Sequence, residues 1–308
     1  MKLGLLFSGQ GSQKQNMGFD LYKDSKTVRE FYDGLNLSFD IKDISFGADD
    51  ATLKKTVYTQ PVLVAFHIAV LKRLKELGVR YDMVAGLSLG EFSALYAAGV
   101  LSSTDVMKII EKRAEYMSES CKKTPSTLVA ILGLDFEEFI PHLEELKKQG
   151  IFAEIANLNC PKQVVIGIKL DDLEQVSAYF SELGKLKVIP LEVEGAFHTS
   201  VMDEAALKLR AELSAYEFSD ELVPIVYNRT GEFKGDNSFI NLLSEQANNT
   251  TYFEKSLRKM IDEGVNTFLE IGYNDIFKGF MKRIDRKIRV IPINSVESIE
   301  LLSKEFII

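Results

Sequence analysis

The N-terminal part of the chain alternates apolar runs with glycine-rich turns. The apolar segment KLGLLF is followed by SGQGSQ, which predicts a buried first strand that ends in a tight turn. From Pro61 to about Gly78, apolar residues fall on more than one side of the helical repeat, as in a largely buried helix. The segments MVAG, LSLG and EFSALYAAGVL then predict a strand, a sharp turn and a helix. This order is typical of an α/β layered domain.

Residues 126–192 show a different and self-contained alternation. STLVAILGL, IFAEIANLN, QVVIGIK and KLKVIPLEV each predict a strand, whereas DFEEFIPHLEELKKQG and DDLEQVSAYFSELG predict helices that end at Gly150 and Gly184. The resulting order βαββαβ is that of a small ferredoxin-like unit. Farther along, VPIVYN and NTFLEIG predict additional strands. We therefore expect a large α/β domain made of 1–125 and 193–308, with 126–192 inserted as a small domain.

Composition and charge narrow the classes of function. The chain has 308 residues, 46% of them hydrophobic and 27% charged, as in an ordinary globular protein. Its net charge of -8 argues against binding to nucleic acid or to an anionic membrane, because such proteins use clustered cations. Cys121 and Cys160 form no CxxC pair or Cys/His cluster, so neither a metal site nor a disulfide framework is indicated. No apolar run reaches the length of a signal peptide or a membrane span, which predicts a cytoplasmic protein.

The segment GLSLG, from Gly86 to Gly90, matches the pattern G-x-S-x-G. Glycines flank the serine in this pattern because a strained turn between a strand and a helix leaves no room for side chains. Ser88 would then be a nucleophile, and the backbone amide of Leu89 would face the negative charge that develops during attack. The alternative is a glycine-bounded turn whose serine caps the next helix. The strand before the turn and the helix after it favour the nucleophile.

A serine hydroxyl needs a base, and the chain offers three histidines. His142 lies among glutamates on a predicted helix, and His67 lies in the apolar run VLVAFHIAV, where a histidine is more often a satisfied core residue. His198, in GAFHTSVM, follows the last predicted strand of the insert, and catalytic residues collect in such loops. His198 is therefore the favoured base. The pattern leaves open whether a carboxylate or a backbone carbonyl fixes its tautomer.

Arg113 interrupts an apolar stripe in the predicted helix STDVMKIIEKRAEYMSES. Val106, Ile109, Ile110 and Met117 share one helical face, and Arg113 falls on the same face. A buried guanidinium is costly unless an anion pairs with it, and its planar fork matches a carboxylate. Two interpretations remain open here. Arg113 either forms a structural ion pair or reaches water, or it binds a carboxylate carried by the substrate.

Taken together, FSGQGSQ, GLSLGE, the downstream arginine and GAFH resemble the malonyl-CoA:acyl carrier protein transacylases of fatty-acid synthesis and the related acyltransferases of polyketide synthases. TQPVLVA, NLNCPKQVVIG and the closing LEIG and KRI extend the similarity along the chain. The resemblance implies an α/β-hydrolase-like large domain with a parallel sheet core, plus an inserted small ferredoxin-like (βαββαβ) domain. It also implies an enzyme that uses malonyl-CoA and acyl carrier protein and needs no cofactor or metal.

The same resemblance implies a role for each of the main candidate residues. Ser88 is the nucleophile, and His198 is the base that activates it. The backbone amides of Gln10 and Leu89 form the oxyanion hole. Arg113 holds the free carboxylate of the malonyl group, which favours the substrate-binding interpretation of its buried position.

Other positions bear on orientation and specificity. Gln246, in SEQANN, aligns with a family glutamine whose backbone carbonyl orients the histidine. Leu87 stands where the family commonly has histidine, Ser8 replaces a frequent proline, and GYND replaces a common GPG. None of these differences removes a catalytic group, and they leave the finer shape of the pocket open. In the related polyketide enzymes, a phenylalanine at the position of Phe197 and a branched apolar residue at that of Leu89 go with malonyl substrates. We therefore expect malonyl specificity, although one methyl group discriminates only about 10- to 200-fold in an apolar pocket.

The expected reaction is a two-stage transfer of malonyl from malonyl-CoA to the phosphopantetheine thiol of acyl carrier protein, through a malonyl ester on Ser88. Acyl carrier proteins are typically acidic, so a monomer with a net negative charge needs a local basic surface. The segment KGFMKRIDRKIR supplies one and carries Lys278, Lys282, Arg283, Arg286, Lys287 and Arg289. A solvated helix face is the alternative. Rival functions are the loading of a polyketide assembly line, a serine esterase or thioesterase, and a non-catalytic CoA-binding scaffold.

Overall fold

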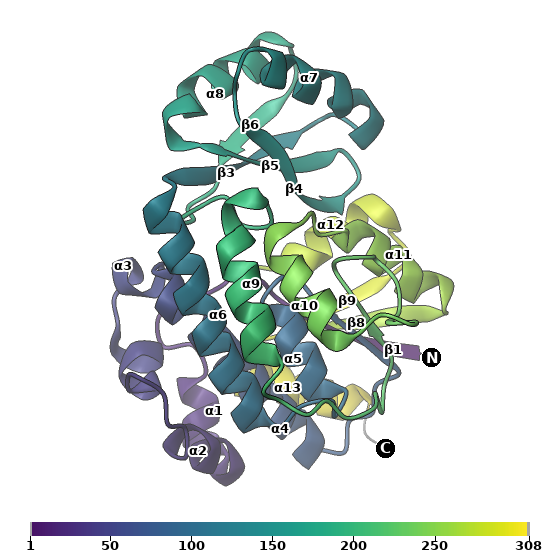
Figure 1. Ribbon diagram of the computed structural model, residues 1–308. Helices are drawn as coiled ribbons and strands as arrows, with labels where there is room; N and C mark the ends of the chain where they lie inside the picture. The colour runs from purple at the N-terminus through teal and green to yellow at the C-terminus, as the bar shows by residue number, and fades with distance from the viewer. Residues whose placement is uncertain (1, 307–308) are drawn as a thin grey trace.

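Two separate β-sheets organise the structure, a computed structural model that describes residues 2–306 (Figure 1). Within these residues, the larger sheet has five parallel strands in the order β7-β2-β1-β8-β9. Its strands are β1 (Lys2–Phe7), β2 (Met83–Gly86), β7 (Ile225–Val226), β8 (Val265–Ile271) and β9 (Arg289–Ile293). The smaller sheet, in the same part of the chain, has four antiparallel strands in the order β4-β5-β3-β6. Its strands are β3 (Ser126–Leu132), β4 (Ala153–Cys160), β5 (Gln163–Lys169) and β6 (Lys187–Pro190).

Helices cover both faces of the parallel sheet, which explains why β1 is apolar along most of its length. Leu3, Leu5 and Phe7 belong to the core on one face, and Leu6 belongs to the core on the other. The first face is covered by α4 (Thr56–Glu76), α5 (Gly90–Ala97) and α6 (Ser103–Lys123), and the second by α11 (Phe253–Asp262) and α12 (Ile276–Ile284). The predicted α/β class with a parallel sheet core is confirmed.

Several predicted elements differ in length from the apolar runs that indicated them. The helix predicted from Pro61 begins earlier, at Thr56, and runs through the proline. The strand predicted in VPIVYN is only β7, which ends at Val226. It ends there because the amide of Tyr227 donates to Glu232 O in an antiparallel bridge, which turns the chain away from the sheet. The apolar run KLKVIPLEV likewise contributes only the short edge strand β6.

The smaller sheet has its own core and lies at the top of Figure 1. Its strand order, with the two central strands β5 and β3 flanked by β4 and β6, is that of the ferredoxin-like unit predicted from the βαββαβ order. Helices α7 (Phe136–Lys148) and α8 (Leu173–Glu182) cover one face. The rings of Phe139 and Phe180 stack between them, with their centroids 5.4 Å apart. Asp135 and Glu138 form a capping box that starts α7. The opposite face packs against α6 through a fourth apolar cluster.

The two parts of the chain also join through backbone hydrogen bonds. The amide of Leu158 in β4 donates to Thr251 O at 2.9 Å, and the amide of Thr251 donates to Ala156 O at 2.9 Å. The remaining helices are α1 (Phe19–Asp24), α2 (Lys26–Asp33), α3 (Asp50–Leu53), α9 (Asp203–Leu213), α10 (Phe239–Asn248) and α13 (Val296–Phe306). Across residues 2–306, no helix has the length and apolar character needed to cross a membrane.

Candidate active site

Ser88 stands in the turn between β2 and α5 with a left-handed backbone, at φ +54°. A non-glycine residue in this region is strained, as expected for a serine presented by a sharp turn. The glycines of the motif are needed for close packing. A Cβ on Gly86 would lie 2.0 Å from the carbonyl carbon of Gly90, and a Cβ on Gly90 would lie 2.3 Å from Phe7 O. No side chain fits at either position.

Asn228 lies just after the edge strand β7, and its side chain binds the backbone of the Ser88 turn. Its Oδ1 accepts from the amide of Ser88 at 2.7 Å, and its Nδ2 donates to Gly86 O at 2.6 Å. Asn228 is not among the residues predicted from the sequence. No local pattern identifies it, because it is remote from Ser88 in the chain and approaches only when β7 pairs with β2.

His198 lies in contact with the hydroxyl of Ser88, with Nε2 2.8 Å from Oγ. Its Nδ1 lies 2.7 Å from the backbone carbonyl oxygen of Gln246. Because a carbonyl can only accept, Nδ1 carries the ring proton and donates it, and Nε2 is free to accept from the Ser88 hydroxyl. The acceptor that was left open is therefore a backbone carbonyl. Like Ser88, His198 has a left-handed backbone, at φ +62°, and its amide donates to Ala247 O at 3.0 Å.

The environment keeps the imidazole of His198 neutral. Burial, reinforced by the positive charge of Arg113, lowers the pKa of His198 to about 3, against a weaker opposing effect of the hydrogen bond to Gln246. The ring is therefore in the form that accepts a proton at neutral pH.

Arg113 is buried, with 1% of its surface exposed, on the apolar face of α6 on which its spacing placed it. Its partners are neutral oxygens. Nη2 donates to Ser88 Oγ at 3.1 Å and to Gln246 Oε1 at 2.9 Å, and Nη1 donates to Gln60 Oε1 at 2.6 Å. Its Nε is buried and has no hydrogen-bond partner in the part of the chain that the structure describes. Burial lowers the pKa of Arg113 to about 10, so the guanidinium stays charged at neutral pH beside the serine.

Glu91, in the first turn of α5, is a buried carboxyl that the sequence analysis also missed. Its Oε1 accepts from the amide of Asn228 at 2.7 Å, and its Oε2 accepts from Nε2 of Gln246. The same Nε2 also donates to Ser88 O at 3.0 Å. Burial raises the pKa of Glu91 to about 8, although its two donors and the charge of Arg113 oppose that rise. Glu91 could have been identified as Arg113 was, because it is a charged residue in the otherwise apolar segment EFSALYAAG.

Gln10 and Leu89 lie on neighbouring loops, at the ends of β1 and β2. The amide of Leu87 donates to Phe7 O at 2.9 Å, and a Cβ on Gly9 would lie 3.1 Å from Leu87 O, so the two loops are in contact. Leu89 is the residue before α5, and its side chain is buried in the main core. The side chain of Gln10 donates weakly to Thr56 Oγ1 at 3.5 Å.

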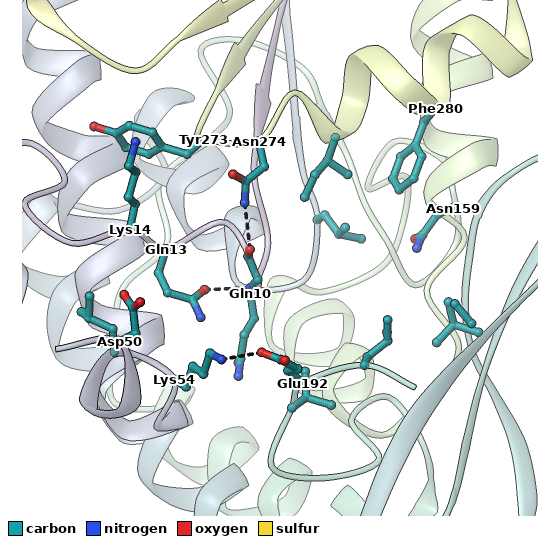
Figure 2. A pocket seen from close by; sticks show the side chains of 18 of the residues that line it. Gln10, Gln13, Lys14, Asp50, Lys54, Asn159, Glu192, Tyr273, Asn274 and Phe280 are labelled. Carbon is teal, nitrogen blue, oxygen red and sulfur yellow. Dashed lines mark hydrogen bonds and ion pairs between the residues drawn. The ribbon is translucent and has the colours of Figure 1, made fainter. Parts of the chain in front are cut away.

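A cavity of about 920 Å³ opens beside these loops, between the two sheets. Gln10 and Leu87 connect it to the Ser88 turn, and Figure 2 shows Gln10 at its centre. The small sheet contributes Asn159 to its wall, and the C-terminal segment contributes Tyr273. An ion pair between Lys54 and Glu192, with Nζ 2.5 Å from Oε2, crosses one side (Figure 2).

The other candidate residues lie outside this contact network. Phe197 is 5% exposed and packs in the apolar cluster between α6 and the small sheet, beside Met117 and Met202. His67 is a buried core residue, as expected, with Nε2 3.0 Å from Ser8 Oγ. His142 is half-buried, and its Nδ1 lies 3.0 Å from the hydroxyl of Tyr179, so it is less solvated than its glutamate neighbours suggested.

The basic segment occupies α12 and the turn after it. Lys282, Arg283, Arg286 and Lys287 are exposed, whereas Lys278 is half-buried and pairs with Asp275 at 3.8 Å. Among residues 2–306, no group of three or more histidine, cysteine, aspartate or glutamate side chains is arranged to hold a metal ion.

Known proteins resemble this chain over almost its whole length. The family model for the acyl transferase domain matches residues 5–284. The chain is 37% identical over 303 residues to malonyl CoA-acyl carrier protein transacylase of Bacillus subtilis (strain 168), covering 97% of this chain and 96% of that protein.

Solved structures agree. The crystal structure of malonyl CoA-acyl carrier protein transacylase from Clostridium perfringens has a TM-score of 0.93 at 32% identity, covering 99% of this chain and 97% of that one. A malonyl-transacylase in complex with a type II PKS acyl-carrier protein has a TM-score of 0.92 at 28% identity, covering 99% of this chain and 100% of that one. The chain therefore belongs to the acyl transferase family, among the malonyl CoA-acyl carrier protein transacylases.

Proposed function

We propose that this protein transfers the malonyl group from malonyl-CoA to the phosphopantetheine thiol of acyl carrier protein, in fatty-acid biosynthesis, through a malonyl ester on Ser88. The observation that carries the proposal is the double contact of Ser88 Oγ, with His198 Nε2 at 2.8 Å and Arg113 Nη2 at 3.1 Å. A base at this distance activates a hydroxyl. A buried cation beside the same oxygen suits an acyl group that ends in a carboxylate. The names of the relatives support the same substrate and partner.

In the first stage, Ser88 gives its proton to His198 Nε2, and its oxygen attacks the thioester carbonyl carbon of malonyl-CoA. The carbonyl oxygen becomes negative and accepts hydrogen bonds from the backbone amides of Gln10 and Leu89. Leu89 stands at the start of α5, where the helix dipole favours an anion. The carbon–sulfur bond then breaks, the CoA sulfur takes the proton from His198, and the malonyl ester remains on Ser88.

In the second stage, the phosphopantetheine thiol gives its proton to His198 and attacks the ester carbonyl carbon. The same two amides hold the second oxyanion. The bond between the carbonyl carbon and Ser88 Oγ breaks, and the serine oxygen recovers the proton from His198. The free enzyme is restored and the malonyl thioester leaves on the carrier protein. The leaving oxygen takes its proton from the imidazolium, and the hydrogen bond from Nδ1 to the carbonyl of Gln246 keeps Nε2 directed at Ser88 in both the neutral and the protonated form.

Arg113 is the proposed site for the malonyl carboxylate. Its buried Nε has no partner among the described residues and shares an edge of the guanidinium with Nη2, which faces Ser88. A carboxylate that bound this edge side-on would accept from both nitrogens. It would also neutralise a buried charge that otherwise has only neutral oxygens as hydrogen-bond partners. This contact selects acyl groups with a free carboxylate.

Intact-mass measurement after mixing with malonyl-CoA tests the proposal. The expected product is one malonyl adduct per chain, absent in Ser88→Ala and lost again when acyl carrier protein is added. Absence of an adduct on the wild-type protein contradicts the proposed function. An adduct that disappears in water without carrier protein indicates a serine esterase or thioesterase instead.

Specificity within the malonyl class is assigned to Phe197 and Leu89. Both residues are next in sequence to a proposed catalytic residue, Phe197 to His198 and Leu89 to Ser88, and bulk at these positions is proposed to leave little room for an α-methyl group. Loading with methylmalonyl-CoA tests this assignment, because Phe197→Ser should raise the methylmalonyl rate relative to the malonyl rate. The change should stay within about 10- to 200-fold, the discrimination that one methyl group allows.

The exposed cations of α12 and its following turn, Lys282, Arg283, Arg286 and Lys287, are the proposed docking surface for acidic acyl carrier protein. Lys278 contributes less, since it pairs with Asp275. Phe280 and Ile276 of the same helix line the cavity beside Gln10, so a partner bound there would lie near the entrance to the site.

The proposed place of action is the cytoplasm. Cys121 and Cys160 are free and buried, which agrees with a reducing compartment.

A further inference from the structure

We propose that Glu91 is a positioning residue for acyl-group selection: together with the backbone oxygen of Ser88, its carboxyl group fixes the orientation of the Gln246 carboxamide, which holds the guanidinium of Arg113 beside Ser88. The inference rests on the proposed function, because it concerns the residue that binds the malonyl carboxylate. It assigns to Glu91 a role that acts through two other side chains and not by contact with substrate.

Glu91 and the backbone oxygen of Ser88 together determine which way the Gln246 carboxamide points. The backbone oxygen of Ser88 only accepts hydrogen bonds, so the group of Gln246 that faces it must be the NH2, and this NH2 also donates to Glu91 Oε2. The second hydrogen of that NH2 goes to Ser88 O, at 3.0 Å. The carboxamide oxygen is thereby turned to the opposite side, where it accepts from Arg113 Nη2 at 2.9 Å.

The opposite orientation of the carboxamide would be doubly unfavourable. It would put the carbonyl oxygen of Gln246 against the backbone oxygen of Ser88 and the NH2 group against the guanidinium of Arg113. The side chains of Gln246 and Arg113 are buried, so water cannot compensate for either mismatch. Glu91 is itself fixed from its other side by the amide of Asn228, at 2.7 Å.

Arg113 is therefore held between two amide oxygens, those of Gln60 and Gln246, with Nη2 also directed at Ser88. When Glu91 is ionised, its charge favours the charged form of this guanidinium and opposes the effect of burial. Acyl groups with a free carboxylate depend on this arrangement because they bind the guanidinium. Acyl groups without one, such as acetyl, use only Ser88, His198 and the oxyanion amides.

Glu91→Gln provides the test, because it keeps the shape of residue 91 and replaces one acceptor with a donor. The malonyl and acetyl loading rates of Ser88 are measured by intact mass with the two CoA thioesters. We expect the ratio of malonyl to acetyl loading to fall about 10- to 100-fold, the effect of one mispaired buried polar group. The loss should appear mainly in KM for malonyl-CoA, since the guanidinium is displaced and the Ser88–His198 pair is not.

Glu270→Gln is the matched control. Glu270 is equally buried and also accepts two N–H groups, from the amides of Phe277 at 2.8 Å and Lys278 at 3.0 Å, away from the Ser88 network. This variant should lose stability, as Glu91→Gln does, without changing the malonyl to acetyl ratio. An equal loss of malonyl and acetyl loading in Glu91→Gln overturns the inference and leaves Glu91 a structural residue.

Coupling to Arg113 gives a second readout. If Glu91 acts through Arg113, Glu91→Gln should change malonyl loading much less in an Arg113→Ala background than in the wild type, whereas independent effects would multiply. If Glu91→Gln does not fold, Gln246→Met is the alternative test of the inference. It keeps the backbone carbonyl that binds His198 and removes the carboxamide that binds Arg113. A malonyl-selective loss in Gln246→Met supports the inference, and a non-selective loss overturns it. Failure of the wild type to form any adduct would instead reject the proposed function.

Discussion

Arg113 donates a hydrogen bond from Nη2 to Oγ of Ser88, at 3.1 Å, while His198 contacts the same oxygen from Nε2. The hydroxyl thus lies between a buried cation and a neutral base. In the proposed mechanism the two contacts have separate tasks, because the imidazole transfers the proton and the guanidinium binds the carboxylate of the acyl group.

Replacing Arg113 with alanine should nearly abolish malonyl loading and leave acetyl loading equal or faster. The carboxylate of malonyl loses its partner in a buried site, whereas acetyl has no carboxylate to bind. Initial rates of adduct formation with the two CoA thioesters measure the difference. Lys112→Ala, at the neighbouring, partly exposed position of α6, is the control and should leave both rates unchanged. Equal loss of both activities would contradict the carboxylate role.

The pH dependence of acetyl loading should change in Arg113→Ala. Burial and the Arg113 charge together lower the pKa of His198 to about 3 in the wild type. Removal of the positive charge stabilises the imidazolium, so the pKa of His198 rises and the acid limb of the rate profile moves to higher pH. Stopped reactions with acetyl-CoA at pH values between about 3 and 7 follow this limb. A limb that stays in place or moves to lower pH would show that the two groups are not coupled.

Acid should destabilise the protein through its buried histidines. Burial lowers the pKa of His67 to about 3, from the 6.5 of a free imidazole. The unfolded chain therefore binds a proton as the pH falls below about 6.5 while the folded state does not, and stability is lost from there toward pH 3. Between about pH 6.5 and pH 3, each such histidine lowers the free energy of unfolding by about 1.4 kcal/mol for every unit that the pH falls.

Urea unfolding of the wild type and of His67→Gln, compared at several pH values, measures this effect. The substitution removes the titrating group, so the pH slope of the free energy of unfolding should fall by about 1.4 kcal/mol per unit. The glutamine can still bond Ser8, which His67 contacts at 3.0 Å. An unchanged slope would show that His67 does not titrate on unfolding.

Two glycine substitutions should have effects of opposite sign. Gly86→Ala places a Cβ 2.0 Å from the backbone of Gly90, at the end of the Ser88 turn. We therefore expect the free energy of unfolding to fall by more than about 3 kcal/mol and no malonyl adduct to form on Ser88. Gly279→Ala, on the exposed side of α12 with open space around its Cβ, should raise the free energy of unfolding by about 0.5–1 kcal/mol. Thermal or urea unfolding compares them. Tolerance of Gly86→Ala would contradict the described geometry of the turn.

Charge reversal on α12 and its following turn tests the docking surface. Lys282→Glu combined with Arg286→Glu should raise KM for acyl carrier protein without changing malonyl loading from CoA, and the effect should shrink at high salt. The control reverses the same number of charges at the exposed Lys147 and Lys148 of α7. If KM for the carrier protein rises equally in both pairs, the effect is one of net charge alone, and docking at α12 is rejected.

Much of the architecture could be predicted from local patterns. The alternation in residues 126–192 predicted every strand and helix of the small sheet in order, and the strand, turn and helix around Ser88 are all present. The family, which the motifs predicted, is confirmed by the relatives. Helix starts and strand ends were less accurate, as at Thr56 and Val226, because hydrogen bonds to distant segments decide where an element stops.

The sequence by itself determined the element order, the serine turn and the anomalous burial of Arg113, since each depends on residues close together in the chain. Only the tertiary structure decided which group binds the second nitrogen of His198 and which side chains fix Arg113. Those contacts join α4, α5, α6 and α10 through residues far apart in sequence, such as Glu91 and Gln246. Hydrogen-bond donors and acceptors of this kind become partners only after the sheet and its helices have packed.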